Sequence, residues 1–450
     1  MSAFVHAHAT HPDWRMAFGL VAAQIDAQRS LQAHAAAPTL GWCYVTDHYA
    51  PAAEALLAAL RERWPGVDWV GTVGVGVCAS GVEYFDEPGL AVMLAALPRE
   101  QFRLFSGLRP LAASAGFAAH AALVHADPST QELAGLIGEL SDRMDSGYLF
   151  GGLAAARNRT LTIASPGAAA GAAGGEARPG VFEGGLSGVA FASEVALVSR
   201  VTQGCQPIGA TRRITEADRH VVYALDGEPA LDCLLRDLGV DAREPRAALP
   251  KLRTTLVGLS DDEAQAEFGA PPLASAFATL APTSEFVTPA RRGAFGTETR
   301  VRHLVGIDPQ RRGIAVADSV EAGQQLAFCR RDTDAARRDL VRIATEIRSA
   351  LEPAELPLPR RAPRGDADLV TQTRPGAAVS RSGGRKVAGA LYVSCSGRGG
   401  PHFGGPSAEL QILRHALGDV PLVGFFAAGE IGHRHLYGYT GVLTVFAEPA

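Results

Sequence analysis

The stretch Ala390-Leu-Tyr-Val-Ser-Cys395-Ser-Gly-Arg398-Gly-Gly-Pro-His-Phe403 decides how the carboxyl-terminal part of this chain folds. Its apolar run ends in a turn of small residues that carries one cysteine and one arginine. A helix and a second apolar run follow, and the second run reads Val420-Pro-Leu-Val-Gly424-Phe-Phe-Ala-Ala-Gly429-Glu430. We therefore expect two buried strands that deliver Arg398 and Glu430 at their carboxyl ends, where glycines let a ligand approach the backbone. This arrangement is typical of a small-molecule pocket and not of a nucleic-acid surface.

The same order of elements recurs earlier in the chain: a strand, a helix, a second strand that ends in glycines, and a hairpin closed by a further strand. The copies cover residues 40–94, 121–191 and 390–446. A fourth, weaker copy begins at Val221 and ends with a hairpin over 301–317. Val70-Gly71 in the first copy aligns with Val423-Gly424 in the third without a gap.

Duplicated strand–helix–strand–hairpin units predict an α+β fold. Short strands joined by hairpins favour mixed or antiparallel sheets, and we expect helices to cover these sheets on the outside. The chain is predicted to form two pseudo-symmetric halves, residues 1–222 and 223–450. Residues 353–386, which are rich in Pro, Arg, Gly and Ser, are predicted to form a flexible linker within the second half.

Composition argues against several classes of protein. A chain of 450 residues with 47% hydrophobic and 20% charged residues is ordinary for a globular protein of two or three domains. Its net charge of −5 argues against non-specific nucleic-acid binding, which needs a basic surface. No apolar run approaches the length of a membrane helix, and the first residues lack the pattern of a signal peptide. We therefore expect a cytoplasmic protein that binds neither membranes nor nucleic acid, with its six scattered cysteines as reduced thiols.

Arg398 and Glu430 are the strongest candidates for ligand contact. A guanidinium offers a bidentate fork to a carboxylate, and the amide groups of neighbouring glycines such as Gly399 add donors. Glu430 follows Gly429 at the end of an apolar run, so a buried Glu430 needs a cationic partner. Together the two charges suit an amino acid, whose carboxylate and ammonium groups match them. The structural alternative is an internal salt bridge from Arg398 to Glu409 or Glu430.

Two cysteines lie in turns beside these residues. Cys205 belongs to a Gly-Cys-Gln-Pro turn and Cys395 to a Ser-Cys-Ser turn. A catalytic thiol needs a base or a field that stabilises its thiolate. His402 is seven residues from Cys395, but no neighbouring acid is present to orient it. We expect both cysteines to line the pocket, and we assign no catalytic residue.

Three further segments extend the pattern over nearly the whole chain: Gln203-Gly-Cys205-Gln-Pro207-Ile-Gly209, Leu225-Asp226-Gly227-Glu-Pro-Ala230, and the run from Gly323 to Arg331-Asp332. With the stretch from Ala390, their order resembles the FIST family, the paired sensory domains of bacterial signalling proteins and of some eukaryotic F-box proteins. The resemblance implies an N-terminal FIST domain over 1–222 and a C-terminal one over 223–450. It also implies binding of small ligands, of which amino acids are the usual suggestion, without catalytic activity.

The resulting hypothesis is a cytoplasmic sensory protein that binds a small polar ligand, such as an amino acid, and acts on a separate signalling partner. No cofactor is expected, because Gly74-Val-Gly76 does not complete a dinucleotide-binding motif. No metal is expected either, because His6, His8 and His11 have no cysteine or carboxylate directly beside them. Two alternatives stay open: a hydrolase or transferase that uses a thiol or carboxylate in the same pocket, and a protein-interaction scaffold. The predicted ligand-binding residues are Arg398, Cys395, Glu430, Cys205, Gly399 and Gly429.

Overall fold

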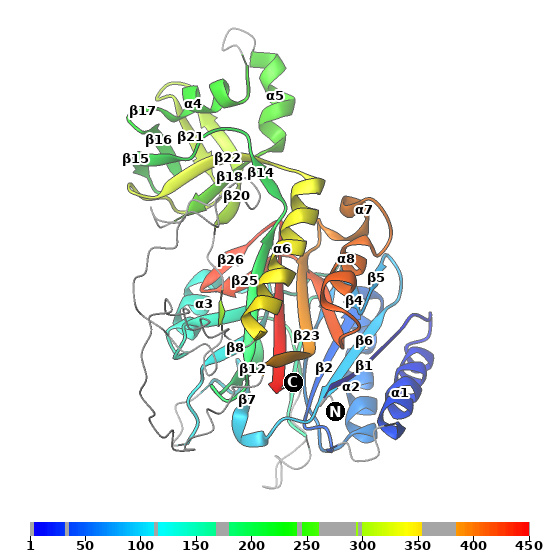
Figure 1. Cartoon of the computed structure of the whole chain (residues 1–450). Helices are drawn as coiled ribbons and strands as arrows, with labels where there is room; N and C mark the ends of the chain where they lie inside the picture. Colours follow the sequence, from blue (N-terminus) through cyan, green and yellow to red (C-terminus); the bar gives the residue numbers. More distant parts are fainter. Residues whose placement is uncertain are drawn as a thin grey trace, which may run out of the picture.

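The computed structural model describes residues 4–31, 36–111, 116–167, 180–240, 245–260, 294–295, 299–352 and 384–449. A large body of three sheets carries a small barrel at one end (Figure 1). The predicted α+β class is confirmed, since the sheets are mixed or antiparallel and helices cover their outer faces. The predicted linker over 353–386 lies outside the described residues, apart from its last three.

Each sheet of the body is built around a parallel pair of strands joined by a helical connection. The pairs are β2 (Leu40–Thr46) with β3 (Asp68–Gly74), β8 (Ala121–Ala126) with β9 (Tyr148–Leu153), and β23 (Arg385–Cys395) with β24 (Leu422–Ala427). These pairs belong to the three copies predicted from the sequence, and we call the copies units 1, 2 and 3.

Two antiparallel strands extend each pair on one side. The inner strand closes the unit, and the outer strand precedes the unit in the chain. In unit 1 they are β6 (Leu90–Ala95) and β1 (Phe4–Ala9), in unit 2 β12 (Leu186–Phe191) and β7 (Phe102–Ser106), and in unit 3 β27 (Thr440–Pro449) and β13 (Leu197–Gln203).

The hairpin that follows each parallel pair leaves its own unit and joins another sheet. Unit 1 gives β4 (Gly76–Ala79) and β5 (Val82–Phe85) to β24, unit 2 gives β10 (Thr162–Ser165) and β11 (Val181–Phe182) to β3, and unit 3 gives β25 (Glu430–His433) and β26 (His435–Tyr437) to β9. The exchange is cyclic, so each sheet contains strands from two units. The boundary predicted near residue 222 falls inside the strand β16 (Val221–Leu225). It also separates β13 from β27 in the sequence, although these two strands pair in one sheet.

A glycine occupies the same position in the second strand of each parallel pair. A Cβ atom on Gly71, Gly151 or Gly424 would lie 1.8, 2.0 or 1.7 Å from the carbonyl oxygen of the residue opposite. No side chain fits at such distances, because the neighbouring strand's backbone fills the space. This close approach explains the Val-Gly repeat that the sequence shows at positions 71 and 424.

The three sheets enclose one apolar core, and the helices form a separate outer layer on each. Side chains from all three units meet in the central cluster, among them Trp42, Phe150 and Phe425. At its centre Tyr44 Oη lies 3.2 Å from His125 Nε2. The first sheet is covered by α1 (Trp14–Ser30) and α2 (Ala53–Arg63), the second by α3 (Leu133–Ser141), and the third by α6 (Thr333–Leu351), α7 (Gly399–Phe403) and α8 (Ala408–Leu417).

The barrel is inserted between β13 and α6 of unit 3. Its strands are β14 (Cys205–Pro207), β15 (Arg212–Asp218), β16 (Val221–Leu225), β17 (Glu228–Pro229), β18 (Thr255–Ser260), β20 (Arg300–Asp308), β21 (Gly313–Val316) and β22 (Gln325–Arg331), with helices α4 (Ala230–Asp237) and α5 (Pro245–Thr254). The sheet closes because β22 pairs with β15 on one side and with β18 on the other. The short strand β19 (Ala294–Phe295) pairs with β13 in the body instead.

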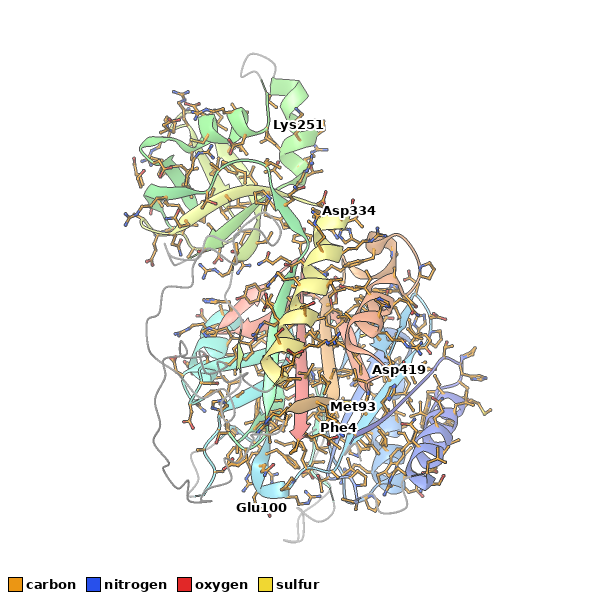
Figure 2. The ribbon with its side chains drawn as sticks, viewed as in Figure 1. Phe4, Met93, Glu100, Lys251, Asp334 and Asp419 are labelled. Atoms are coloured by element: carbon orange, nitrogen blue, oxygen red, sulfur yellow. The ribbon has the colours of Figure 1, made fainter. Side chains whose placement is uncertain are left out.

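The barrel replaces the fourth copy that the sequence pattern predicted. The expected hairpin exists as β20 and β21, but every strand pairing within the barrel is antiparallel among the described residues. The prediction was wrong because α4 does not lead into a strand parallel to β16. Beyond the barrel, Asp332 begins α6 by accepting a hydrogen bond from the Ala335 amide at 2.6 Å. Figure 2 labels Asp334 in this first turn, where α6 leaves the barrel and enters the body.

Substitution of the repeated glycines tests the close packing of the parallel pairs. We expect Gly71→Ala, Gly151→Ala and Gly424→Ala each to lower the free energy of unfolding by at least about 3 kcal/mol, because the added methyl group would overlap a backbone carbonyl. Gly19→Ala is the control: it lies in α1 with open space around it and should stabilise by about 0.5–1 kcal/mol. Urea denaturation measures all four, and a near-neutral result at the three strand positions would contradict the packing.

The exchange of hairpins makes a second prediction. Residues 1–222 and 223–450, expressed separately, should each fail to give a cooperatively folded protein, because β24 needs β4 and β9 needs β25. Expressed together, they should form one complex with the circular dichroism spectrum of the intact chain. Size-exclusion chromatography and thermal melting check this, and a stable monomer of either fragment alone would refute it.

Candidate functional site

Arg398 lies in the turn between β23 and α7, at the end of the body that carries the barrel. The residue is 3% exposed. Its Nε atom donates to Glu409 Oε1 at 2.9 Å, and its guanidinium lies 5.1 Å from the centre of the Phe403 ring. The structural alternative considered for this arginine, a salt bridge with Glu409, is therefore present. Nevertheless, Arg398 Nη2 is buried and has no hydrogen-bond partner within the described residues.

Glu409 has a full set of donors besides Arg398. Tyr392 Oη donates to Oε1 at 2.6 Å, and Ser394 Oγ donates to Oε2 at 3.0 Å. The Gly399 amide also donates to Oε2, at 3.1 Å. This buried carboxylate therefore fixes Arg398 and its turn in place. The Gly399 amide, expected as a donor to a ligand, is already used by the protein.

A second buried carboxylate, Glu83, holds the same turn from the other side. It reaches the turn from β5, the strand that unit 1 gives to the third sheet. Its oxygens accept hydrogen bonds from the Gly400 amide at 2.6 Å and from the Leu410 amide at 3.1 Å. Burial raises the pKa of Glu83 to about 7, and the charge of Glu409 adds to the rise. Sequence analysis missed Glu83 because nothing near it in the chain indicates the turn that it contacts.

Glu430 is the first residue of β25 and is fully buried. Its Oε2 atom accepts hydrogen bonds from the Thr440 amide at 3.1 Å and from Thr440 Oγ1 at 2.7 Å. Its Oε1 atom has no partner among the described residues. Burial raises the pKa of Glu430 to about 8, although the Thr440 bonds and the charge of Arg398 oppose the rise. At neutral pH the carboxyl group is therefore mostly protonated.

Cys395 ends β23, near Arg398 and Glu430. Burial raises the pKa of its thiol to about 11, and the charge of Glu430 adds to the rise. No hydrogen bond joins Cys395 to His402 in the described part of the chain, and burial lowers the pKa of His402. A protonated thiol without a hydrogen-bonded base does not match the requirements of a Cys–His nucleophile.

Cys205 approaches the same place from the barrel. It starts β14, directly after Gly204, where a Cβ atom would lie 3.3 Å from Arg398 Nη1. A hydrogen bond from Cys329 and the charges of Arg331 and Arg398 lower the pKa of Cys205, although burial opposes them.

Tyr439 completes the group, and sequence analysis did not single it out. Its carbonyl accepts a bond of 3.4 Å from Arg398 Nη1, and its ring lies 5.0 Å from the Arg331 guanidinium. Its hydroxyl forms a hydrogen bond with His303 of the barrel. The φ angle of Tyr439 is +63°, a left-handed conformation that is uncommon for residues other than glycine.

The structure thus brings four of the six predicted residues together, and with Tyr439 we call them the junction cluster: Arg398, Cys395, Glu430, Cys205 and Tyr439. The other two predicted residues are glycines beside them. Gly399 donates to Glu409, and the carbonyl of Gly429 accepts from the Leu153 amide at 2.8 Å. The cluster combines a buried arginine and a buried carboxyl group, and each keeps one polar atom without a partner among the residues that the structure describes.

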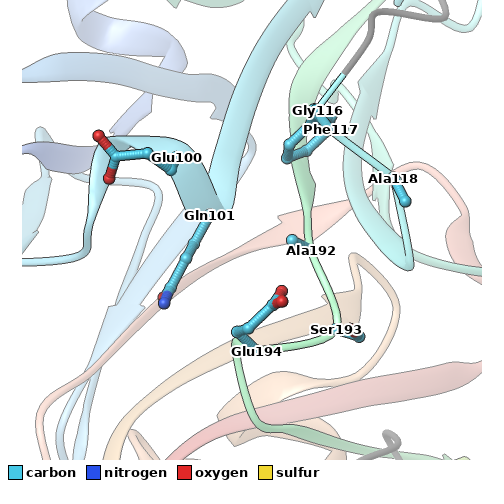
Figure 3. A pocket seen from close by; sticks show the side chains of 8 residues that line it. All are labelled: Glu100, Gln101, Gly116, Phe117, Ala118, Ala192, Ser193 and Glu194. Atoms are coloured by element: carbon cyan, nitrogen blue, oxygen red, sulfur yellow. The ribbon is translucent and has the colours of Figure 1, made fainter.

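A separate pocket lies elsewhere on the body (Figure 3). Its volume is about 580 Å³, and it is lined by Glu100, Gln101, Gly116, Phe117, Ala118, Ala192, Ser193 and Glu194. No residue of the junction cluster lines it. In the described residues we find no group of His, Cys, Asp or Glu side chains that suits a metal ion. No helix in the same part of the chain is long and apolar enough to span a membrane.

Comparison with known proteins places the two halves of the chain in one family. The FIST N domain model matches residues 39–228, and the FIST C domain model matches residues 230–433. An uncharacterized protein of Mycobacterium tuberculosis is 29% identical over 455 residues, which cover 98% of each chain. An uncharacterized protein of Mycobacterium bovis is 28% identical over 454 residues, which cover 98% of this chain and 97% of the relative.

The pH dependence of stability tests the state of Glu430. Its pKa in the folded protein, about 8, exceeds the ordinary value of 4.5, so the folded state binds more protons than the unfolded state between these limits. Stability should therefore fall as the pH rises through this window, and Glu83 contributes in the same direction up to about pH 7. We expect Glu430→Gln to reduce the decrease in the free energy of unfolding between pH 5 and 8, as measured by urea denaturation. Glu139→Gln, on the exposed face of α3, is the control, and an unchanged slope in Glu430→Gln would contradict the assignment.

Proposed function

The chain belongs to the FIST family, whose domains are sensory domains of signal-transduction proteins, and on this premise we propose that it binds a small polar ligand at the junction cluster. The proposed ligand is an amino acid. The proposed location is the cytoplasm, and the proposed receiver of the signal is a separate protein.

The observation that carries the proposal is the pair of unpartnered atoms on Arg398 and Glu430. A buried polar atom without a partner costs about 1–3 kcal/mol, and more when it is charged. Proteins satisfy most such atoms internally, and exceptions often mark functional positions. Here Arg398 Nη2 and Glu430 Oε1 are both buried, and neither has a hydrogen-bond partner within the described residues. A ligand with an anionic and a cationic end supplies a partner to each.

The hydrogen bonds that Arg398 and Glu430 already make limit how the proposed amino acid would bind. Arg398 already uses Nε for Glu409, so the ligand carboxylate takes a single bond from Nη2 and not the bidentate fork expected from the sequence. Glu430 is mostly protonated in the free protein, so it becomes a carboxylate only when the ligand ammonium arrives. Binding near pH 7 should therefore release a proton.

The position of the cluster supports a sensory role. Cys205 belongs to the barrel, whereas Arg398 and Glu430 belong to the body. Two further contacts cross the same boundary: Tyr439 with His303, and the Arg331 guanidinium with the Gly397 carbonyl. A ligand at this place alters the contacts that set the position of the barrel, and a partner that reads this position receives the signal.

The choice of variants follows from the buried charges. Arg398→Ala removes the cationic partner of Glu409 and is expected to cost about 3–5 kcal/mol of stability, so it cannot isolate binding. Glu430→Gln keeps the shape of the protonated side chain and should leave the fold intact at pH 7. Arg414→Ala is a matched control, because this arginine pairs with Asp419 at the surface of unit 3.

We expect native mass spectrometry of the freshly purified protein to show a bound small molecule that is not converted to a product. Titration calorimetry with that molecule should show about 30-fold weaker binding in Glu430→Gln, since a charge-assisted bond in a desolvated site is worth about 2 kcal/mol or more. Arg398→Lys should weaken binding as well, and Arg414→Ala should not. Full binding by both folded site variants would disprove the site. Conversion of the bound molecule to a product would instead favour a hydrolase or transferase. A protein that carries no small molecule and binds none of the twenty amino acids would favour a protein-interaction scaffold.

A further inference from the structure

Two of the six cysteines face each other at the base of the barrel. Strand β14 pairs antiparallel with β22, and Cys205 lies opposite Arg331 while Pro207 lies opposite Cys329. Residues that are opposite, or two apart along a strand, share one face of a sheet. Cys205 and Cys329 are therefore diagonal neighbours on one face. Both side chains pack in the same apolar cluster, together with Leu256 and Val301.

The environments of the two sulfur atoms differ in a way that suits stepwise oxidation. Cys205 is partly exposed, and the hydrogen bond from Cys329 and the charges of Arg331 and Arg398 lower its pKa. Cys329 is buried, and that same hydrogen bond together with burial raises its pKa, so it remains a thiol. Cys205 is therefore the thiol of the pair that ionises more readily, and Cys329 is the one that stays protonated.

The other cysteines lack this setting. All six cysteines lie in the described residues, and all are free thiols. Burial raises the pKa of Cys43 to about 12 and that of Cys395 to about 11, and it also raises those of Cys78 and Cys233. Cys205 alone combines partial exposure, a neighbouring thiol and two nearby guanidinium groups.

We propose that Cys205 and Cys329 form a dithiol site that hydrogen peroxide or an organic peroxide oxidises to a disulfide. The Cys205 thiolate attacks one peroxide oxygen, the O–O bond breaks, and water or an alcohol leaves after protonation, so Cys205 becomes a sulfenic acid. The Cys329 sulfur then attacks the Cys205 sulfur and displaces water. Two thiols and one peroxide thereby give one disulfide and, for hydrogen peroxide, two molecules of water.

The surroundings support both steps. The guanidinium groups of Arg331 and Arg398 stabilise the thiolate and the negative charge that develops on the leaving oxygen. The Cys329 thiol lies diagonal to Cys205 on the same face of the sheet, which favours disulfide formation over further oxidation. The site does not depend on the ligand proposed above.

A disulfide at this position acts on the connection between barrel and body. The chain enters the barrel at Gly204 and leaves it at Asp332, and the Asp332 amide donates to the Gly204 carbonyl at 3.0 Å. The pair Cys205–Cys329 lies directly beside this crossing. Oxidation would tie the entering strand covalently to the leaving strand, and so restrict rotation of the barrel.

Peroxide treatment of the reduced full-length protein tests the proposal. Intact mass should fall by two hydrogen atoms, and peptide mapping should find one disulfide, between Cys205 and Cys329. In Cys329→Ser, dimedone should trap a sulfenic acid at Cys205, and in Cys205→Ser neither product should form. Cys233→Ser, which removes a buried thiol elsewhere in the barrel, should behave like the parent. First oxidation at another cysteine, or conversion of Cys205 in the parent to sulfinic acid without the disulfide, would overturn the proposal.

A second measurement tests whether Cys205 reacts because the nearby arginine lowers its pKa or only because the thiol is exposed to solvent. We expect Arg331→Gln to slow alkylation of Cys205 by iodoacetamide at pH 7 by about threefold and to move the pH profile upward, because a tenfold change in thiolate fraction corresponds to one pKa unit. Arg348→Gln, an exposed position on α6, should leave the profile unchanged. An unchanged profile in Arg331→Gln, with the protein folded, would show that the arginine does not activate Cys205 and would count against the site.

Discussion

No sheet of the body is complete without a hairpin from another unit, and the rest of the structure depends on this constraint. Strand β24 takes β4 from unit 1, β3 takes β10 from unit 2, and β9 takes β25 from unit 3. Each hairpin covers one edge of a parallel pair, so β3, β9 and β24 become inner strands and β11, β26 and β5 form the new sheet edges. Because the exchange is cyclic, each unit stabilises one neighbour and is stabilised by the other, and a single core forms between all three sheets.

The exchange also assembles the junction cluster. Glu83 reaches the Arg398 turn on the hairpin of unit 1, and Glu430 lies on the hairpin that unit 3 gives to unit 2. Arg398 itself follows the first strand of unit 3, and Cys205 arrives from the inserted barrel. Residues more than 300 positions apart in the chain thus meet, as the bond between the Gly400 amide and Glu83 shows.

The buried charges of the site divide into two groups. Glu409 is saturated by Arg398, Tyr392, Ser394 and a backbone amide, so it serves the structure. Glu430 is bound only through Thr440 and keeps one oxygen without a partner in the described residues, at a cost that folding alone does not require. This difference, and not burial by itself, separates a scaffold residue from a candidate ligand contact.

The sequence by itself determined the units, because strand length, helix pattern and glycine position are local properties. Gly71 and Gly424 aligned in the sequence and occupy equivalent strands. Arg398 follows the carboxyl end of β23 as expected, whereas Glu430 begins β25 instead of ending β24. Only the tertiary structure decided which sheet each hairpin joins, that the strands from β14 to β22 other than β19 form a barrel, and that Glu83 and Tyr439 lie beside Arg398. The physical reason is that a hairpin's backbone hydrogen bonds are satisfied by any strand edge, so its partner is selected by packing between residues distant in the chain.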